Sequence, residues 1–507
     1  MSLPLPRLTP FAIALLAGLA QALSIAAPWD GQPHWWLQLL SLAALAWVLR
    51  SERQPVRAFL LGWLFATSWL AATYWWLYIS MHTYGGLAAA LTVIAVVGLA
   101  AFLSLYYAAA SALFALSVRG RWAPLVFAAL WSFAELLRVT LFTGFPWGAG
   151  GYAHGDGPLA GYAPWIGVHG MTFLAAFLAA VLAGTRRTGG APRAATAVAV
   201  LLLGLALPLA GEFTSSAGRV SVTLLQGNIP QDEKFERGSG IPLALDWYGR
   251  QLQEATATLV VAPETALPVL PRQLPEGYFA AVTQRYTGGN QAMLVGIPLG
   301  SNAEGYTNSV IGLKPGAAMY RYDKHHLVPF GEFIPPLFRW FTEMMNIPLG
   351  DFNRGLVGQP SFEWSGQRFA PNICYEDLFG EELGRRFADA GTAPTVFVNV
   401  SNIGWFGNTI AIDQHLQISR LRALEFERPM LRATNTGATV IIDFRGKVTH
   451  SLPRFTRAVL TGEVEGRTGT TPYAWWVARA GLWPWWLLFG AIGAFALWRR
   501  GIAGAAP

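Results

Sequence analysis

The sequence predicts a multi-pass α-helical membrane bundle that carries one water-facing α/β domain. Hydrophobic residues make up 53% of the 507-residue chain and charged residues only 13%, whereas an ordinary soluble domain has about 25% charged residues. Long apolar stretches without charges occur before residue 212 and after residue 479. Between these positions strand-like and helix-like segments interleave, which is typical of a single α/β domain.

Seven membrane spans are expected before residue 212, because a transmembrane helix needs about 20 predominantly apolar residues. The first apolar stretch has the length of a signal peptide, but further spans follow it directly, so we interpret it as a retained helix. Gly85-Gly86 marks a turn between the third and fourth spans. The eight expected spans cover 8–29, 31–49, two spans within 58–118, 122–142, 159–185, 194–211 and 480–498.

The loops between the spans indicate the orientation. Arginine occurs only in alternate loops, while the opposite short loops near 26–33, 79–86 and 143–158 contain neither lysine nor arginine. Short cytoplasmic loops are enriched in basic residues, so both termini are predicted to be cytoplasmic. The arginines are Arg7, Arg50, Arg53, Arg57, Arg119, Arg121, Arg186, Arg187, Arg193, Arg499 and Arg500.

This orientation divides the chain into three parts. Residues 1–211 form an N-terminal membrane domain, 212–479 an extracytoplasmic domain, and 480–507 a closing span with a short cytoplasmic tail. Between Arg219 and Glu465 there are 22 Lys+Arg against 24 Asp+Glu, and the remainder has 14 against 5. The basic balance therefore belongs to the membrane part, which argues against a nucleic-acid-binding domain.

The α/β domain is expected to contain nine strands and four helices. The segment Arg219–Gln226 alternates between polar and apolar residues, as a half-buried strand does. The expected strands are 219–226, 258–262, 292–297, 308–313, 368–373, 395–400, 430–433, 440–444 and 459–464, and the expected helices are 241–254, 276–286, 381–390 and 411–427.

Cys374 is the only cysteine in the chain, so an intramolecular disulfide or a thiolate metal cage is excluded. It follows a predicted strand and precedes the acidic residues Glu376 and Asp377, which fit the first turn of a helix. A thiolate at such a strand-to-helix turn would be stabilised by backbone donors. The alternative is a small buried core residue, because free cysteine is among the most buried residue types.

Two further signals precede this cysteine. Glu264 ends the apolar run Val261-Ala262-Pro263, and Lys324 is one of only four lysines against 32 arginines. A chain that prefers arginine so strongly is expected to keep a lysine where a compact ammonium is needed. Glu264 could take the thiol proton, and Lys324 could stabilise the oxyanion formed when the sulfur attacks an acyl carbonyl. The alternative is a buried ion pair near an unrelated cysteine.

The order Glu264, Lys324, Cys374 resembles the nitrilase superfamily, and together with the spans the chain resembles the apolipoprotein N-acyltransferase family. Matching segments occur along essentially the whole chain: Gly144-Phe145-Pro146-Trp147-Gly148, Gln226-Gly227-Asn228-Ile229-Pro230-Gln231, the run from Lys324 to Glu332, Asn372-Ile373-Cys374-Tyr375-Glu376, and Asn399-Val400-Ser401-Asn402. One departure is Ile403-Gly404 before Trp405-Phe406, where the family pattern has an aspartate and a small residue.

The resemblance implies a nitrilase-like αββα sandwich outside the cytoplasm of a bacterial inner membrane. It implies a triad of Glu264 as base, Lys324 as oxyanion stabiliser and Cys374 as nucleophile, supported by Glu332, Tyr375 and Glu376. The implied reaction moves an acyl chain from a phospholipid to the α-amine of the N-terminal S-diacylglyceryl cysteine of an apolipoprotein. It proceeds through a thioester on Cys374 with ping-pong kinetics.

An apolar segment between the lysine and the cysteine suggests where lipid enters. It contains Pro335-Pro336 and lacks a helical period, so it is expected to be a loop that meets the bilayer surface. The alternative is ordinary core. The candidate lipid-entry residues are Phe338, Trp340, Phe341, Trp405 and Trp147.

The remaining expectations concern other site types. Glu135 and Arg138 lie three residues apart near the outer end of the fifth span, and a structural pair supporting the loop 143–157 is favoured over a proton relay. The eight histidines lack metal-ligand spacing, and a nucleotide-binding glycine fingerprint is absent, so neither metal nor cofactor is expected. A monomer is expected.

Two alternative functions stay open. A membrane-tethered amidase would use the same triad but pass the acyl group to water, although the apolar segment and the bundle favour a lipid substrate. A transporter with an extracytoplasmic receptor domain is a third hypothesis, and the scarcity of charges inside the spans gives it little support.

Overall fold

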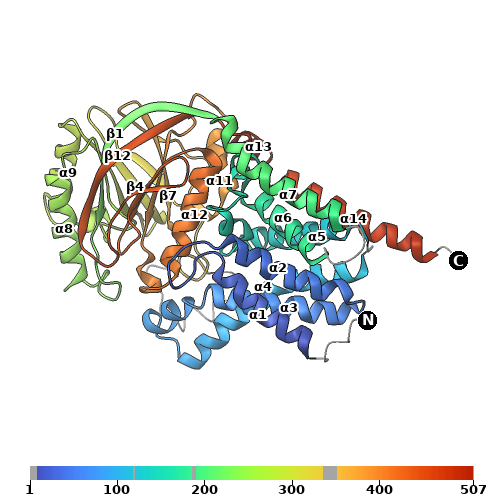
Figure 1. The fold of residues 1–507 in the computed structure, drawn as a ribbon. Helices are drawn as coiled ribbons and strands as arrows, with labels where there is room; N and C mark the ends of the chain where they lie inside the picture. The colour runs from blue at the N-terminus through green and yellow to red at the C-terminus, as the bar shows by residue number, and fades with distance from the viewer. Residues whose placement is uncertain (1–7, 118–119, 185–189, 335–350, 506–507) are drawn as a thin grey trace. The chain divides into compact units, whose positions relative to one another are not determined.

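The computed structural model describes residues 8–117, 120–184, 190–334 and 351–505 (Figure 1). The chain divides into two compact units. The first comprises Met1–Leu77, Ala89–Gly211 and Ala480–Pro507, and the second comprises Glu212–Arg479 together with Tyr78–Ala88. The short segment Tyr78–Ala88, expected only as a loop between two spans, therefore belongs to the α/β unit.

The first unit is helical. Its helices are α1 (Thr9–Leu23), α2 (Trp35–Ser51), α3 (Pro55–Thr73), α4 (Ala89–Leu116), α5 (Ala123–Thr140), α6 (Ala163–Gly184), α7 (Gly190–Ala206) and α14 (Trp483–Ala505). In the described part of the chain, five helices are long and apolar enough to cross a membrane, built on α3 to α7. A sixth is obtained if α14 and the bent helix before it, α13 (Pro472–Ala480), count as one span.

Of the eight expected spans, the structure therefore supports five or six. Helix α1 has 15 residues and α2 has 17, which at 1.5 Å per residue gives about 23 and 26 Å. Both are shorter than the ~30 Å hydrocarbon core. Charge-free stretches in the sequence run on past these helix ends, so hydropathy alone overestimates the helical length. The turn at Gly85-Gly86 is present, with Gly86 at φ 70° after the single-turn helix η1 (Ile79–Tyr84).

Glu135 and Arg138 of α5 both bind the loop that follows this helix. The Glu135 carboxylate accepts a hydrogen bond from the backbone N–H of Gly150 at 2.9 Å. The Arg138 guanidinium donates to the backbone carbonyls of Phe145 and Trp147 at 2.6 and 2.7 Å. Both charged groups satisfy backbone groups of a non-helical loop, which is what a loop inside an apolar bundle requires.

The second unit contains two six-stranded sheets. The first has the order β12-β1-β2-β3-β4-β5 and the second β11-β10-β9-β8-β7-β6. The strands are β1 (Thr214–Gln226), β2 (Leu259–Val261), β3 (Ala292–Ser301), β4 (Gly305–Leu313), β5 (Tyr320–Asp323), β6 (Phe362–Trp364), β7 (Gln367–Ile373), β8 (Val396–Ser401), β9 (Met430–Thr434), β10 (Val440–Ile442), β11 (Val448–Ser451) and β12 (Ala458–Gly469).

Helices cover the outer faces of the sheets, as the α8–α9 layer beside the first sheet shows (Figure 1). They are α8 (Gly240–Glu254), α9 (Tyr278–Thr287), α11 (Gly380–Gly384) and α12 (Ala411–Phe426). Alternate residues of one strand face opposite layers. In β2, Leu259 and Val261 join the core between the sheets, whereas Val260 joins the core beneath α8 and α9. The result is the expected αββα sandwich.

All nine expected strands and four helices exist with shifted ends, but three strands were missed. These are β5, β6 and β11, which have three or four residues each and form edges of the two sheets. Edge strands are short and partly solvent-exposed, so they lack the apolar run that identifies a central strand.

The topology brings the ends of several strands together. Strands β1, β2 and β3 are parallel neighbours in one sheet, and β7, β8 and β9 are parallel neighbours in the other. Glu264 comes shortly after β2, Cys374 directly after β7, and Ser401 ends β8. Side chains at the carboxyl ends of parallel strands meet at one edge of a sheet, which is where α/β proteins place their sites.

Candidate active site

Cys374 begins a five-residue 3-10 turn, η8 (Cys374–Leu378), immediately after β7. Its φ is +52°, a left-handed conformation that is uncommon for a residue other than glycine. The turn is held from both sides: Asn399 of β8 donates from Nδ2 to the Cys374 carbonyl at 3.1 Å, and Glu376 accepts from the Ile373 N–H at 2.6 Å. Such strained backbone persists only where its surroundings fix it.

Glu376 and Asp377 lie in the first turn of η8, as the sequence predicts for the start of a helix, and both side chains are buried. Glu376 is 3% exposed and accepts hydrogen bonds from the backbone N–H groups of His325 and His326 at 2.7 and 3.2 Å. The Tyr322 hydroxyl donates to the same carboxylate at 2.7 Å. Burial raises the pKa of Glu376 above its ordinary value. This side chain therefore ties the segment around Lys324 to the turn that carries Cys374.

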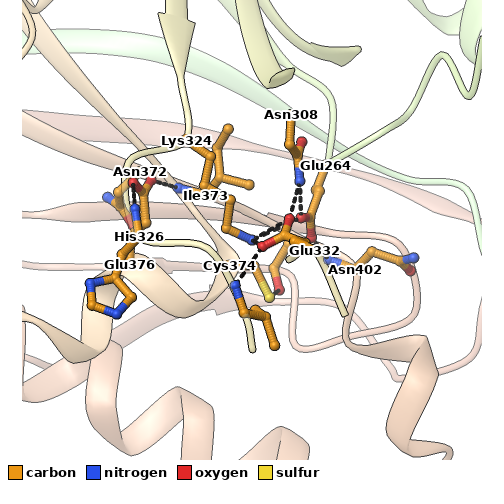
Figure 2. A network of polar contacts seen from close by, with 12 residues as sticks. Glu264, Asn308, Lys324, His326, Glu332, Asn372, Ile373, Cys374, Glu376 and Asn402 are labelled. Atoms are coloured by element: carbon orange, nitrogen blue, oxygen red, sulfur yellow. Dashed lines mark hydrogen bonds and ion pairs between the residues drawn. The ribbon is translucent and has the colours of Figure 1, made fainter. Parts of the chain in front are cut away.

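Lys324 follows β5 and is 1% exposed. Its ammonium lies 2.8 Å from Glu332 Oε2 and 3.4 Å from Glu264 Oε1 (Figure 2). Burial opposes the charge, but the carboxylates of Glu332 and Glu264 outweigh it and raise the pKa of Lys324. The ammonium therefore stays charged across the physiological pH range.

Glu264 is 7% exposed, and two donors besides Lys324 hold its carboxylate. Asn308 of β4 donates from Nδ2 to Glu264 Oε1 at 2.7 Å and also to Glu332 Oε1 at 2.7 Å. The Asn402 backbone N–H donates to Glu264 Oε2 at 2.8 Å. Burial opposes ionisation, but Lys324 and these hydrogen bonds hold the pKa of Glu264 below its ordinary value. At neutral pH the group is a carboxylate that can accept a proton.

The Cys374 thiol lies beside this cluster and receives a hydrogen bond from Ser401 Oγ at 3.2 Å. Burial, and then the negative charge of Glu264, raise the pKa of the thiol to about 12. Burial and Glu264 therefore disfavour the stabilised thiolate that the strand-to-helix turn predicts. The local turn would favour the thiolate, but desolvation by the surrounding sheets and a neighbouring carboxylate dominate.

The other predicted site residues lie at different places. Tyr375 is 5% exposed and packs its ring against those of His326 and Phe379, with centroids 5.7 and 5.2 Å apart. Tyr375 therefore belongs to the same turn as Cys374 and packs it against these two rings. The segment containing Phe338, Trp340 and Phe341 lies outside the described residues.

The two remaining aromatic candidates belong to different units. Trp405 is half-buried in the short helix η10 (Ile403–Phe406) and meets the Tyr84 ring edge-on at 5.8 Å. The neighbouring Ile403, which stands where the family pattern has an aspartate, is 1% exposed. Trp147 lies in the helical unit, is 3% exposed and packs 4.8 Å from the ring of Trp76.

Asn308, Ser401 and Asn402 were not assigned roles from the sequence. Asn308 could have been noticed, because asparagine is depleted in strands and this one lies inside an expected strand. Which way its side chain points follows from the pairing of β4 with β3, where Asn308 faces Pro298. Ser401 and Asn402 belong to a segment that matches the family, and in the structure they contact Cys374 and Glu264.

The described part of the chain contains no group of three or more His, Cys, Asp or Glu that could hold a metal ion. The chemistry available from the side chains is a carboxylate, a fixed ammonium and a thiol that converge in one buried place. This set can support proton transfer, nucleophilic attack and stabilisation of an oxyanion.

Comparisons with known proteins match both units. The family model "Apolipoprotein N-acyltransferase N-terminal domain" matches residues 17–181, and "Carbon-nitrogen hydrolase" matches residues 221–473. An apolipoprotein N-acyltransferase of Verminephrobacter eiseniae is 60% identical, covering 92% of this chain and 92% of that relative. One of Ralstonia nicotianae is 47% identical, covering 93% and 91%. A carbon-nitrogen hydrolase of Helicobacter pylori G27, a solved structure, has 15% identity and a TM-score of 0.36, covering 53% of this chain and 94% of that one.

Proposed function

The chain belongs to the apolipoprotein N-acyltransferase family, and we propose the following reaction for it. It transfers an acyl chain from a membrane phospholipid to the α-amine of an N-terminal S-diacylglyceryl cysteine, through a thioester on Cys374. The observation that carries this proposal is the convergence of the only thiol with the Glu264 carboxylate and the Lys324 ammonium. The related N-acyltransferases support the acyltransferase reaction, and the side chains support the covalent route.

The first half-reaction loads the enzyme. Glu264 takes the proton from the Cys374 thiol as the sulfur attacks the ester carbonyl of the phospholipid. The negative charge moves to the carbonyl oxygen, where the Lys324 ammonium stabilises it. The carbon–oxygen bond to glycerol then breaks, and the glycerol oxygen takes the proton back from Glu264. A lysophospholipid leaves, and Cys374 holds the acyl group as a thioester.

In the second half-reaction the acyl group leaves Cys374 and joins the acceptor. The α-amine of the lipoprotein cysteine attacks the thioester carbonyl, and Glu264 takes a proton from the attacking nitrogen. The carbon–sulfur bond breaks, the thiolate leaves, and the proton returns from Glu264 to the sulfur. Because the first product departs before the acceptor reacts, the kinetics should be ping-pong. Glu332, 2.8 Å from the Lys324 ammonium, keeps this cation in place through both halves.

A lipopeptide assay tests this function. The full-length protein is incubated with phospholipid vesicles and a synthetic peptide that begins with S-diacylglyceryl cysteine. The expected result is an amide-linked third acyl chain on the peptide and an equal amount of lysophospholipid. A peptide with an acetylated α-amine is the matched control and should remain unchanged. Release of free fatty acid without acylated peptide would instead favour the tethered amidase.

The orientation in the bacterial inner membrane is part of the proposal. The alternating arginine loops support a periplasmic location for residues 212–479 and a cytoplasmic location for both termini. Reporter fusions after Ser216 and Gly469 should therefore report the periplasm, and fusions after Arg121 and Arg187 the cytoplasm. A cytoplasmic signal from the Ser216 fusion would contradict this orientation.

A further inference from the structure

A second buried lysine, Lys234, lies next to Glu264. Lys234 belongs to the turn between β1 and α8 and is 1% exposed. Its ammonium donates a hydrogen bond to the backbone carbonyl of Glu264 at 3.1 Å. Within the described residues, this ammonium donates no second hydrogen bond. Burying an ammonium with two unused hydrogen-bond donors costs free energy of folding, so a function for its charge is expected.

The charged neighbours of Lys234 are the groups of the proposed reaction. Burial lowers its pKa to about 7, while Glu264 and then Cys374 pull it upward. Glu264 comes from the segment after β2 and Cys374 from the turn after β7, and the Lys324–Glu332 pair adjoins Glu264. The turn of Lys234 itself carries Asp232, Glu233 and Glu236.

The net charge of the site depends on whether Lys234 is protonated. Glu264 and Glu332 bring two negative charges, and Lys324 brings one positive charge. A charged Lys234 makes the cluster neutral, whereas a neutral Lys234 leaves it with one excess negative charge. Excess negative charge disfavours a thiolate or an oxyanion at the same place, so the protonated lysine lowers the cost of moving negative charge onto the sulfur and the carbonyl oxygen.

We propose that Lys234 is a positioning residue that holds the backbone of Glu264 and supplies the second positive charge for loading Cys374. The proposal rests on the proposed function, because it concerns the thioester-forming step. The protonated form of Lys234 is the active one, so the contribution of this residue is largest at pH 6 and fades as pH rises through about 7 towards pH 9.

The test compares Lys234→Met with the unmodified protein, using the full-length chain and phospholipid alone. Methionine keeps the apolar stem but removes the charge. The rate of acyl-adduct formation on Cys374 is measured by mass spectrometry at pH 6 and pH 9. At pH 6 the unmodified protein should be faster by at least about 10-fold, in line with the loss of one charge-stabilising group. At pH 9 the two rates should approach each other.

Two further variants make the comparison specific. Lys447→Met removes an exposed lysine and should match the unmodified protein at both pH values. Lys234→Arg stays charged at pH 9. The rate of the unmodified protein should therefore fall between pH 6 and pH 9, whereas the rate of Lys234→Arg should not. This comparison is made within one variant and does not depend on how much of it folds.

The outcomes separate this proposal from the function itself. A rate ratio between the unmodified protein and Lys234→Met that is the same at pH 6 and pH 9 would show a purely structural lysine. A ratio of one at both values would remove Lys234 from the mechanism. Absence of any adduct on the unmodified protein would overturn the thioester route, whatever Lys234 does.

Discussion

Cys374→Ser is expected to abolish acyl transfer, with a loss of at least about 1,000-fold in the rate of lipopeptide acylation. A hydroxyl is far harder to ionise than a thiol. The base is Glu264, whose pKa is held below the ordinary value by Lys324 and hydrogen bonds, and so weak a base cannot activate a hydroxyl. Serine has nearly the shape of cysteine and should accept the hydrogen bond from Ser401, so the fold should persist.

The measurement compares initial rates of lipopeptide acylation by Cys374→Ser and the unmodified protein at equal amounts of folded enzyme. Thermal unfolding of the two proteins provides the folding control, and the transition temperatures should agree closely. Retention of even a tenth of the rate by Cys374→Ser would mean that the sulfur is not the attacking atom.

Lys324→Arg is expected to lower the acylation rate by at least about 100-fold although the charge is kept. The site holds a compact ammonium 2.8 Å from Glu332 and 3.4 Å from Glu264 in a place that is 1% exposed. A planar guanidinium is larger and would pair with a carboxylate through two parallel bonds. It would therefore move both carboxylates and place its charge away from the carbonyl oxygen of the substrate.

Lys324→Met tests the charge of this residue, because methionine keeps an unbranched apolar side chain but lacks the ammonium. Lys324 is the strongest influence that lowers the pKa of Glu264, so its removal should raise that pKa and shift the base towards its protonated form. Removing one partner of a buried ion pair also costs about 3–5 kcal/mol of stability, so activity must be compared at equal folded protein. Lys447→Arg, at an exposed position, is the matched control and should be fully active. Substantial turnover by Lys324→Arg would show that Lys324 is structural.

The candidate site could be predicted where a residue was unusual for this chain. Cys374 is its only cysteine, and Lys324 is one of four lysines. Lys234 is equally scarce by residue type, but only the structure shows its buried hydrogen bond to the Glu264 carbonyl. Asn308 was missed because its importance depends on strand pairing, which places it between two carboxylates.

The electrostatics of Cys374 could not be predicted from its neighbours in sequence. A strand-to-helix turn favours a thiolate, whereas the folded site buries the sulfur and places Glu264, from the other sheet, beside it. The central strands were predictable because their sequences show apolar runs or, in β1, an alternation of polar and apolar residues. The edge strands and the ends of α1 and α2 were not, because short segments and helix ends are decided by tertiary packing rather than by local hydropathy.

The mass of the full-length protein after incubation with a phospholipid of one defined acyl chain, in the absence of any lipopeptide, tests the thioester on Cys374 most directly. We predict an increase by one acyl group, located on Cys374 by peptide mapping and removed by neutral hydroxylamine. Adding the lipopeptide should then discharge the protein and yield an equal amount of acylated peptide. An unacylated Cys374 in a preparation that still acylates the lipopeptide would contradict the covalent mechanism.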